Sequence, residues 1–238
     1  MVDSDIERSI EPVEHAPVYG LVVEHIRRAI HIGTFVAGDK LPPERELAKQ
    51  INVSRTTFRE AIRELEGEGY LETRRGATGG VLVLDRGQAE ERLAPLIRQR
   101  LGELEQIIDF RLAVECRAAR LAAVRRGDED LERLTGAFRI MEEGWETRRF
   151  RSADSAFHLG IAEAARNDWM RKAIEDARVA IWVPVDTITD NVFRTAQLHH
   201  AQILAAIRDG DAEAAELAVA AHIESTREDL HKIAAATT

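Results

Sequence analysis

Hydrophobic and polar positions between Lys40 and Val83 predict two short helices followed by a two-stranded ribbon. We expect the first helix to begin at Leu41-Pro42-Pro43-Glu44, because proline is tolerated in a first helical turn, where its missing N–H has no intrahelical partner. Asn52-Val53-Ser54 interrupts this helix, and Ser54 is a suitable N-cap for a second helix over Arg55–Glu66. Strands are expected at Tyr70–Thr73 and Val81–Leu84, and the glycines between them allow a tight turn.

The second helix has two distinct faces. At about 100° per residue, its apolar positions fall on one side: Phe58, Ala61, Ile62 and Leu65. Its polar positions occupy the helix start and an adjacent strip: Arg55, Thr56, Arg59 and Arg63. A helix that enters a DNA major groove must bury one edge and offer guanidinium and hydroxyl groups from another. The pattern therefore predicts a DNA-reading helix.

The chain before this stretch has one amphipathic segment, and the chain after it changes character. Val18–Ile30 has the apolar spacing of a helix, whereas Met1–Ala16 is expected to be a mobile tail and Asp85-Arg86-Gly87 a linker. From Gln88 the sequence is rich in Ala, Leu, Glu and Arg, with almost no strand signal. Seven helical patterns follow, with breaks at residues such as Gly102, Gly127, Asn167 and Gly210: Ala89–Arg100, Leu104–Arg125, Glu129–Glu146, Phe150–Ala165, Trp169–Trp182, Phe193–Asp209 and Ala212–Ala234. This half predicts an all-α antiparallel bundle.

Composition restricts the class of protein. With 238 residues, of which 45% are hydrophobic, the chain can bury a substantial core. It contains no apolar run near the ~20 residues needed to span a bilayer, and its acidic N-terminus lacks the layout of a signal peptide. The single cysteine, Cys116, excludes an internal disulfide framework, fits a reducing cytoplasm and is expected to pack within a helix. We therefore expect a cytoplasmic protein without a membrane segment.

Charge limits how the chain could bind DNA. The net charge is −9, and the stretch from Lys40 to Arg75 has eight Lys/Arg against seven Asp/Glu. This charge argues against non-specific attraction to nucleic acid by the whole surface, so positive charge must act as a local patch. This predicts modest affinity without a partner subunit.

Four residues in the bundle suggest a metal site. Asp154 and His158 are four residues apart and share one helix face with Phe157 and Ile161. His200 shares a stripe with apolar residues one turn on, and His222 lies beside Val219 on a third helix. Taken singly, each histidine is more often a core or surface residue. Together, one carboxylate and three imidazoles suit a borderline divalent ion such as Zn²⁺, Ni²⁺, Fe²⁺ or Mn²⁺.

Residues 40–83 closely resemble the winged helix-turn-helix of the GntR family of bacterial transcription regulators. The matching segments are LPPERELA at 41–48, VSRTTFREA at 53–61, LEGEGYL at 65–71, and the wing GATGGV at 76–81. The resemblance implies contacts with operator DNA by these residues: Arg45, Ser54, Arg55, Thr56, Thr57, Arg59, Arg75 and Gly76. Arg55 and Arg59 could read guanine, while Thr56 and Thr57 would meet phosphate or a thymine methyl. Arg63 lacks this support and is interpreted as a solubility residue.

The second half resembles the FCD ligand-binding domain that accompanies this reader in the FadR subfamily. The matching segments are DFRxxxE at 109–115, DxxFHxxI at 154–161, HxxIxxAIxxGD at 200–211 and AHI at 221–223. In metal-containing members, the aspartate and three histidines at these places hold the ion, which implies a site at Asp154, His158, His200 and His222. His199 departs from the family pattern, which often has glutamate there, but it leaves the four ligands untouched.

The resemblance also implies a small organic acid that completes the metal shell. Arg111 is the candidate for its second contact, since guanidinium pairs well with carboxylate, but an ion pair with Glu115 one turn along is an equal alternative. Asn167 is interpreted as an N-cap. The three tryptophans are interpreted as core or interface residues: Trp145, Trp169 and Trp182.

The sequence thus predicts a mainly α protein with a tail, a winged helix-turn-helix and an FCD-like bundle over residues 1–16, 17–85 and 86–238. We expect a ligand-responsive regulator that binds a palindromic operator as a homodimer, because one small reading unit contacts too few base pairs for specificity. Two alternatives remain open. One is a metal-free acyl-CoA-type sensor of the same fold, and the other is a metal-dependent hydrolase or lyase, for which no convincing general base is evident.

Overall fold

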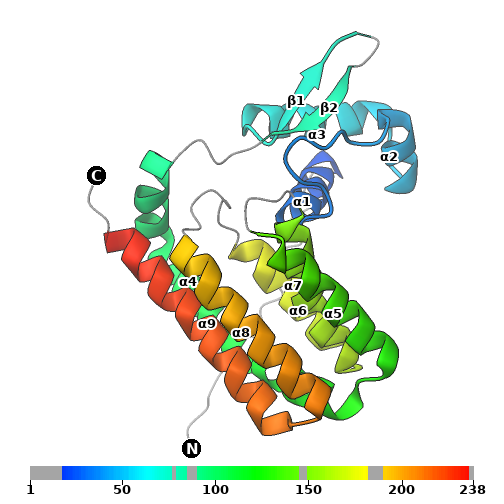
Figure 1. The fold of residues 1–238 in the computed structure, drawn as a ribbon. Helices are drawn as coiled ribbons and strands as arrows, with labels where there is room; N and C mark the ends of the chain where they lie inside the picture. Colours follow the sequence, from blue (N-terminus) through cyan, green and yellow to red (C-terminus); the bar gives the residue numbers. More distant parts are fainter. Residues whose placement is uncertain (1–17, 77–78, 85–89, 145–148, 182–189, 236–238) are drawn as a thin grey trace, which may run out of the picture.

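The computed structural model describes residues 18–76, 79–84, 90–144, 149–181 and 190–235, which form a small reading unit joined to a larger helical bundle (Figure 1). Within these ranges the chain has nine helices and one two-stranded sheet, so the predicted mainly α fold class is confirmed. The predicted tail, the predicted linker, Trp145 and Trp182 lie outside the described residues.

The reading unit contains three helices and a β-ribbon: α1 (Val18–His31), α2 (Glu44–Gln50), α3 (Arg55–Gly67), β1 (Leu71–Arg74) and β2 (Gly80–Val83). The strands are antiparallel, with Leu71 opposite Val83 and Arg74 opposite Gly80. Each strand differs by one residue from its predicted position. Apolar side chains from α1, α2, α3 and both strands meet in one core beneath the ribbon. The ribbon therefore packs against the helices through a shared core.

The start of α2 differs from the prediction. The helix begins at Glu44, with Pro43 in the N-cap position at φ −51° and ψ 135°, so both prolines precede the first turn instead of occupying it. The two consecutive prolines explain this difference, because a residue that precedes proline is disfavoured in the helical region.

The local structure of α3 agrees with its pattern. The Ser54 hydroxyl accepts a hydrogen bond from the Thr57 amide at 3.0 Å, which confirms the predicted N-cap. The four predicted apolar positions are all buried: Phe58, Ala61, Ile62 and Leu65. Burial of this stripe fixes which face of α3 remains available to a partner.

The bundle contains six helices: α4 (Glu90–Arg125), α5 (Asp128–Glu142), α6 (Phe150–Ala164), α7 (Asp168–Ala180), α8 (Asp190–Asp209) and α9 (Ala212–Ala235). The predicted break at Gly102 is wrong, because α4 runs unbroken for 36 residues. Glycine costs about 1 kcal/mol within a helix. Here Ile97 and Leu104 are buried in the bundle core on either side of it, and α4 packs along α9. Packing of both halves outweighs the local preference of one glycine.

The other helix ends follow the sequence more closely. Asn167 caps α7 as predicted, since its side-chain oxygen accepts from the amides of Trp169 and Met170 at 3.1 and 3.2 Å. Gly210 separates α8 from α9 with φ 79°, a left-handed conformation that favours glycine. The turn brings α9 back along α8, and Figure 1 shows these two helices side by side at one face of the bundle.

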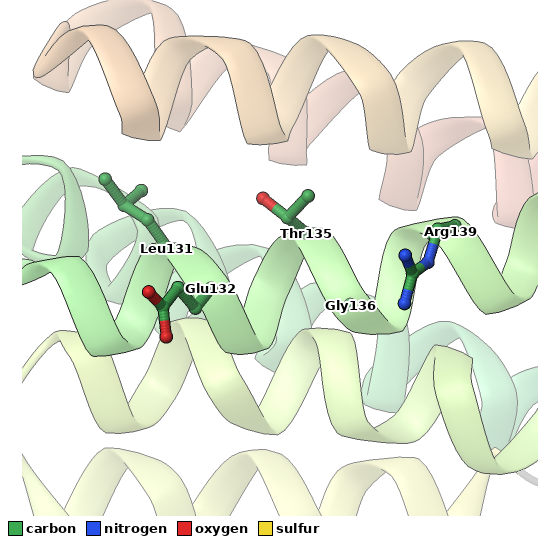
Figure 2. Close-up of a pocket in the computed structure, with 5 residues that line it drawn as sticks. All are labelled: Leu131, Glu132, Thr135, Gly136 and Arg139. Atoms are coloured by element: carbon green, nitrogen blue, oxygen red, sulfur yellow. The ribbon is translucent and has the colours of Figure 1, made fainter.

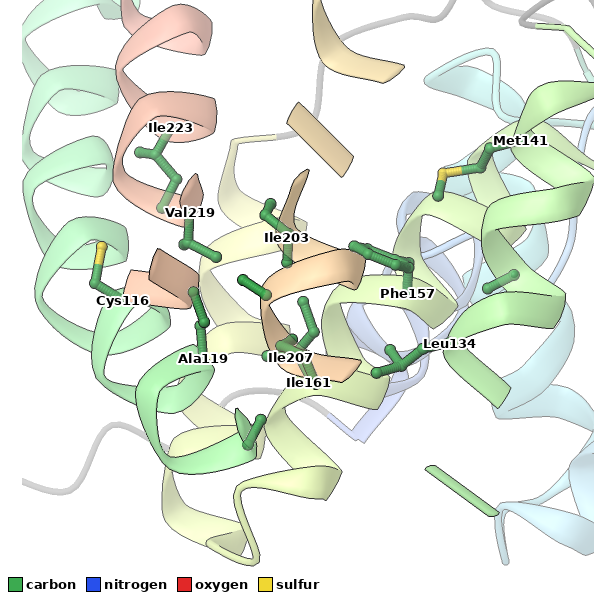
Figure 3. Packing of buried hydrophobic residues seen from close by; sticks show 14 of the residues in the cluster. Cys116, Ala119, Leu134, Met141, Phe157, Ile161, Ile203, Ile207, Val219 and Ile223 are labelled. Carbon is green, nitrogen blue, oxygen red and sulfur yellow. The ribbon is translucent and has the colours of Figure 1, made fainter. Parts of the chain in front are cut away.

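The bundle core surrounds the polar cluster described below. Phe157, Ile203, Ile207 and Ile223 are fully buried, and Figure 3 shows them in the space between α6, α8 and α9. Cys116 packs in the same core as a free thiol, and burial raises its pKa to about 11. This thiol is protonated at neutral pH, which agrees with the predicted packing role.

Candidate metal centre and DNA-reading surface

Three helices bring imidazoles together at the centre of the bundle. His158 on α6, His200 on α8 and His222 on α9 are all buried, and one ligand nitrogen from each lies within 4.8 Å of the others. The Nε2 atoms of His158 and His200 are 3.3 Å apart, and the rings of His200 and His222 have centroids 4.5 Å apart. Three residues separated by up to 64 positions in sequence thus form one compact nitrogen cluster.

The protonation of this cluster follows from its burial. Burial lowers the pKa of all three histidines, that of His200 to about 3, because charged imidazolium is poorly solvated inside the bundle. The imidazoles are therefore neutral near pH 7, and neutral imidazole is the form that binds metal. The Nδ1 atoms of His200 and His222 are buried and have no hydrogen-bond partner among the residues that the structure describes.

Glu115 on α4 orients His158. The Nδ1 atom of His158 lies 3.0 Å from Glu115 Oε2, and a carboxylate can only accept, so Nδ1 carries the proton. The lone pair of His158 is then on Nε2, which faces His200. Carboxylate–histidine pairs of this kind commonly fix the tautomer of a metal ligand. The sequence pattern indicates Glu115 only as a partner for Arg111 and carries no signal for this contact with His158.

Arg111 lies beside Glu115 and is itself buried. Its Nε donates to Glu115 Oε1 at 2.6 Å, so the ion pair considered from the sequence is present. Burial by itself raises the pKa of Glu115, but the Arg111 guanidinium and the His158 hydrogen bond outweigh it and hold that pKa well below its usual range. Among the described residues, the terminal guanidinium nitrogens of Arg111 make no hydrogen bond. They remain available to a second anion.

Asp154 lies at the edge of the histidine cluster. Its Oδ1 atom is 3.5 Å from His200 Nε2 and 3.9 Å from His158 Nε2, although Asp154 is not part of the group whose ligand atoms all lie within 4.8 Å. Its Oδ2 atom pairs with Arg178 on α7. Burial raises the pKa of Asp154, but Arg178 and the histidines outweigh it and hold that pKa well below its usual range. The carboxylate is therefore ionised.

Arg178 was not identified from the sequence. It lies one turn after Ile174, a fully buried residue, on the inward side of an amphipathic helix. An arginine in that position is a signal of a buried partner, since charged residues are rarely buried unless they are paired. Its Nε atom is buried and has no hydrogen-bond partner within the described part of the chain.

The donor set is chemically suited to a divalent ion. Neutral imidazoles and one ionised carboxylate are the ligands that borderline metals such as Zn²⁺ accept, and an ion beside the facing Nε2 atoms of His158 and His200 would use their lone pairs. The residues present therefore fit a metal ion.

The residues predicted to contact DNA are spread over α2, α3 and the end of β1, and all except half-buried Thr57 are exposed: Arg45, Ser54, Arg55, Thr56, Arg59, Arg75 and Gly76. Three of them, Ser54, Thr57 and Arg59, have side-chain hydrogen bonds within the protein. Ser54 caps α3, and its hydroxyl also lies 2.8 Å from that of Thr57. The Arg59 Nε donates to Glu44 at 2.8 Å, although the Arg59 side chain is 54% exposed. An incoming base would compete with Glu44 for this guanidinium.

The surface hollows of the bundle lie elsewhere. One of about 350 Å³ is lined by residues of α5, and Figure 2 shows them: Leu131, Glu132, Thr135, Gly136 and Arg139. None of the predicted metal ligands lines it. The described part of the chain also contains no helix with the length and apolar character needed to cross a membrane.

Comparison with known proteins agrees with this architecture. Residues 18–81 match the gntR family of bacterial regulatory proteins, and residues 106–225 match the FCD domain. The Uxu operon transcriptional regulator of Escherichia coli K12 is 33% identical over 205 residues, which cover 81% of this chain and 79% of that protein. The Exu regulon transcriptional regulator of the same organism is 30% identical over 230 residues, covering 92% of this chain and 86% of that protein.

Structural comparison supports the same fold. The structure of E. coli McbR/YncC matches with a TM-score of 0.55 and 20% identity, over 92% of this chain and 99% of that one. A winged helix-turn-helix joined to a helical effector domain defines a DNA-binding transcription regulator. This chain belongs to the gntR family, in the FadR-like subfamily that carries an FCD domain. It is a regulator and not an enzyme, so the hydrolase or lyase alternative is excluded.

Proposed function

We propose that this regulator senses a small organic acid at a divalent metal ion held by Asp154, His158, His200 and His222. The observation that carries the proposal is the convergence of three buried, neutral imidazoles from three helices. Burying three imidazoles costs more free energy than burying apolar side chains of similar size. The presence of this cluster in the core therefore favours a role in binding a ligand. Bound metal would supply an open coordination position for an effector carboxylate.

Arg111 would hold the same effector from the α4 side. Its Nε is engaged by Glu115, while its terminal nitrogens can form charge-assisted hydrogen bonds with a carboxylate. The two roles considered from the sequence are therefore compatible, because they use different nitrogens of one guanidinium. An effector held between the metal and Arg111 would link α4 to the helices that carry the metal ligands, α6, α8 and α9.

On the DNA side, the regulator would bind a palindromic operator as a homodimer in the cytoplasm. Arg55 and Arg59 would read base edges, and the other contacts would come from these residues: Arg45, Ser54, Thr56, Thr57, Arg75 and Gly76. Effector binding would change the relative placement of two reading units, and a displacement of a few ångströms would misalign them with their half-sites.

Metal analysis of the purified protein tests the metal site. We expect about one Zn²⁺ or related ion for each chain, lost in the variant His158→Ala and retained in His25→Ala, whose residue is exposed on α1. Metal content near zero in the wild-type protein, unchanged by His158→Ala, would favour the metal-free acyl-CoA-type sensor. Calorimetric titration of the metal-loaded protein with small carboxylic acids then identifies the effector class.

A further inference from the structure

The reading unit and the bundle meet at the ends of α1 and α7. Arg28 on α1 forms ion pairs with two acidic residues of α7, with Glu175 at 3.0 Å and with Asp176. One turn further, the Nδ1 atom of His31 lies 3.2 Å from the carbonyl oxygen of Val179 and donates to it. The C-terminal half of α7 is thus attached to the last turn of α1 by both ion pairs and a hydrogen bond.

His31 extends this contact to the β-ribbon. Its Nε2 atom lies 3.0 Å from the hydroxyl of Tyr70, and the two rings pack with centroids 5.5 Å apart. Tyr70 is buried and directly precedes β1, the first strand of the wing. One side chain therefore touches α7 with one nitrogen and the base of the wing with the other.

The same turn of α7 touches the candidate metal centre. Arg178, the residue before Val179, pairs with Asp154 Oδ2 and lies 3.4 Å from the Ser155 hydroxyl, with its side chain 11% exposed. The two oxygens of Asp154 thus have different partners: Oδ1 faces the imidazoles and Oδ2 faces Arg178. A cation at Oδ1 would draw charge from the carboxylate and weaken its attraction for Arg178.

The helix that carries Asp154 also abuts the reading unit. Gly33, in the turn after α1, has φ 76°, and a Cβ at this position would lie only 2.7 Å from Ser152 Cα. Ser152 precedes Asp154 by two residues on α6. The two helices joined by the Asp154–Arg178 pair, α6 and α7, therefore both contact the end of α1 or the turn that follows it. The backbone contact between Gly33 and α6 is too close to admit a side chain at Gly33.

We propose that Arg178 is a positioning residue that transmits the state of Asp154 to the reading unit through Val179 and His31. This inference rests on the proposed metal site. Occupation of that site loosens or redirects the Asp154–Arg178 pair, the last turn of α7 shifts, and the hydrogen bond from His31 to Val179 follows it. Because His31 also holds Tyr70, the shift reaches the base of the wing. The coupling is carried by a contiguous set of contacts.

Hydrogen–deuterium exchange of the full-length, metal-stripped protein tests the coupling, with Zn²⁺ alone as the probe. Binding of Zn²⁺, measured separately by competition with a chromophoric chelator, should alter exchange in α6 and α8. It should also alter exchange in peptides covering residues 26–35 and 68–74, which contain no proposed ligand. If Zn²⁺ binds and those two peptides do not respond, the coupling is refuted while the metal site stands. If Zn²⁺ does not bind, the proposed function fails and the inference with it.

Two arginine variants locate the route. In Arg178→Gln, Zn²⁺ binding should change hydrogen exchange in residues 26–35 by less than about half as much as in the wild-type protein, because the contact that transmits the effect is lost. The matched control is Arg120→Gln, which removes another interhelical ion pair, between α4 and Glu216 on α9, without touching α7. An undiminished response in Arg178→Gln would show that Arg178 carries no signal.

Reciprocity provides a second readout that does not depend on Arg178. His31→Phe keeps a ring against Tyr70 but removes both nitrogens, and it lies outside the metal centre. Because coupling free energies act in both directions, this variant should change Zn²⁺ affinity about threefold or more. His25→Phe, on an exposed position of the same helix, should leave the affinity unchanged. Equal affinities for wild type and His31→Phe would contradict the proposal.

Discussion

At the scale of single residues, the centre of the bundle depends on Glu115. Its two oxygens have separate partners, Arg111 at 2.6 Å and the Nδ1 atom of His158 at 3.0 Å. One carboxylate therefore neutralises a buried guanidinium and fixes the tautomer of a candidate ligand. A buried ion pair is weak evidence for stability, because desolvation offsets much of its attraction. The Arg111–Glu115 pair is better explained by its effect on His158, because Glu115 orients the ring of that histidine.

Replacement of this carboxylate gives a direct prediction. Glu115→Gln keeps an oxygen that can accept from His158 but removes the negative charge that opposes Arg111. We expect Zn²⁺ affinity to fall about 10–100-fold, as for other residues that orient metal ligands, in a chelator competition assay. Glu216→Gln, which breaks the half-exposed pair with Arg120, is the control and should have wild-type affinity. An unchanged affinity in Glu115→Gln would mean that the carboxylate has no role at the metal.

Arg59 offers a second prediction at this scale. In the protein without DNA, its guanidinium pairs with Glu44, which keeps an exposed arginine in a defined position on the reading face. Arg59→Ala should relax discrimination by roughly 1–3 kcal/mol at one operator base pair, measured by competition binding to single-base variants of a selected operator. Arg63→Ala, on the same helix but without family support, should preserve the base preference. A uniform loss of affinity over all sequences in Arg59→Ala would indicate a phosphate contact instead.

At the scale of helices and strands, local signals predict the elements of the reading unit, although α2 begins later than expected and each strand is displaced by one residue. Apolar spacing and the Ser54 cap define α3, and glycines define the ribbon turn. The same signals failed at Gly102, because the stability of α4 comes from its packing along α9 and not from its own propensities. They also give no indication of Arg178. Its ion pair with Asp154 joins two different helices, so it produces no periodic pattern in the sequence. Periodicity predicts which face is buried, but it does not predict which buried polar groups meet.

The cap of α3 can be tested by itself. Ser54→Ala removes the hydrogen bond accepted from the Thr57 amide and should lower the free energy of unfolding by about 1 kcal/mol, measured by urea denaturation. Thr56→Ala, at an exposed position with no cap role, should have a smaller effect. If Ser54→Ala weakened operator binding without lowering stability, Ser54 would act as a DNA contact and not as a cap.

At the scale of the whole molecule, the exposed apolar residues suggest where two copies would meet. Trp169 was interpreted as a core or interface residue, and the structure excludes the core, since the residue is 88% exposed. It lies on α7 next to Met170, which packs against a small apolar cluster formed by residues of α4, α6 and α7. Phe110 and Val124 are exposed on α4, four turns apart at about 3.6 residues per turn, so they lie on one stripe. Exposed apolar surface of this kind often marks an interface.

We therefore predict that the stripe on α4 and Trp169 form the two-fold interface of the homodimer. Sedimentation equilibrium should give a dimer for the wild-type protein, and Val124→Glu combined with Trp169→Glu should give a monomer, because the substitutions would bury unpaired charge. Leu217→Glu, which alters an exposed leucine on α9, is the matched control and should stay dimeric. The monomer should still bind Zn²⁺, since the candidate ligands come from one chain, but it should lose affinity for a palindromic operator. A dimer that survives both substitutions would place the interface elsewhere, and a wild-type monomer would refute the homodimer.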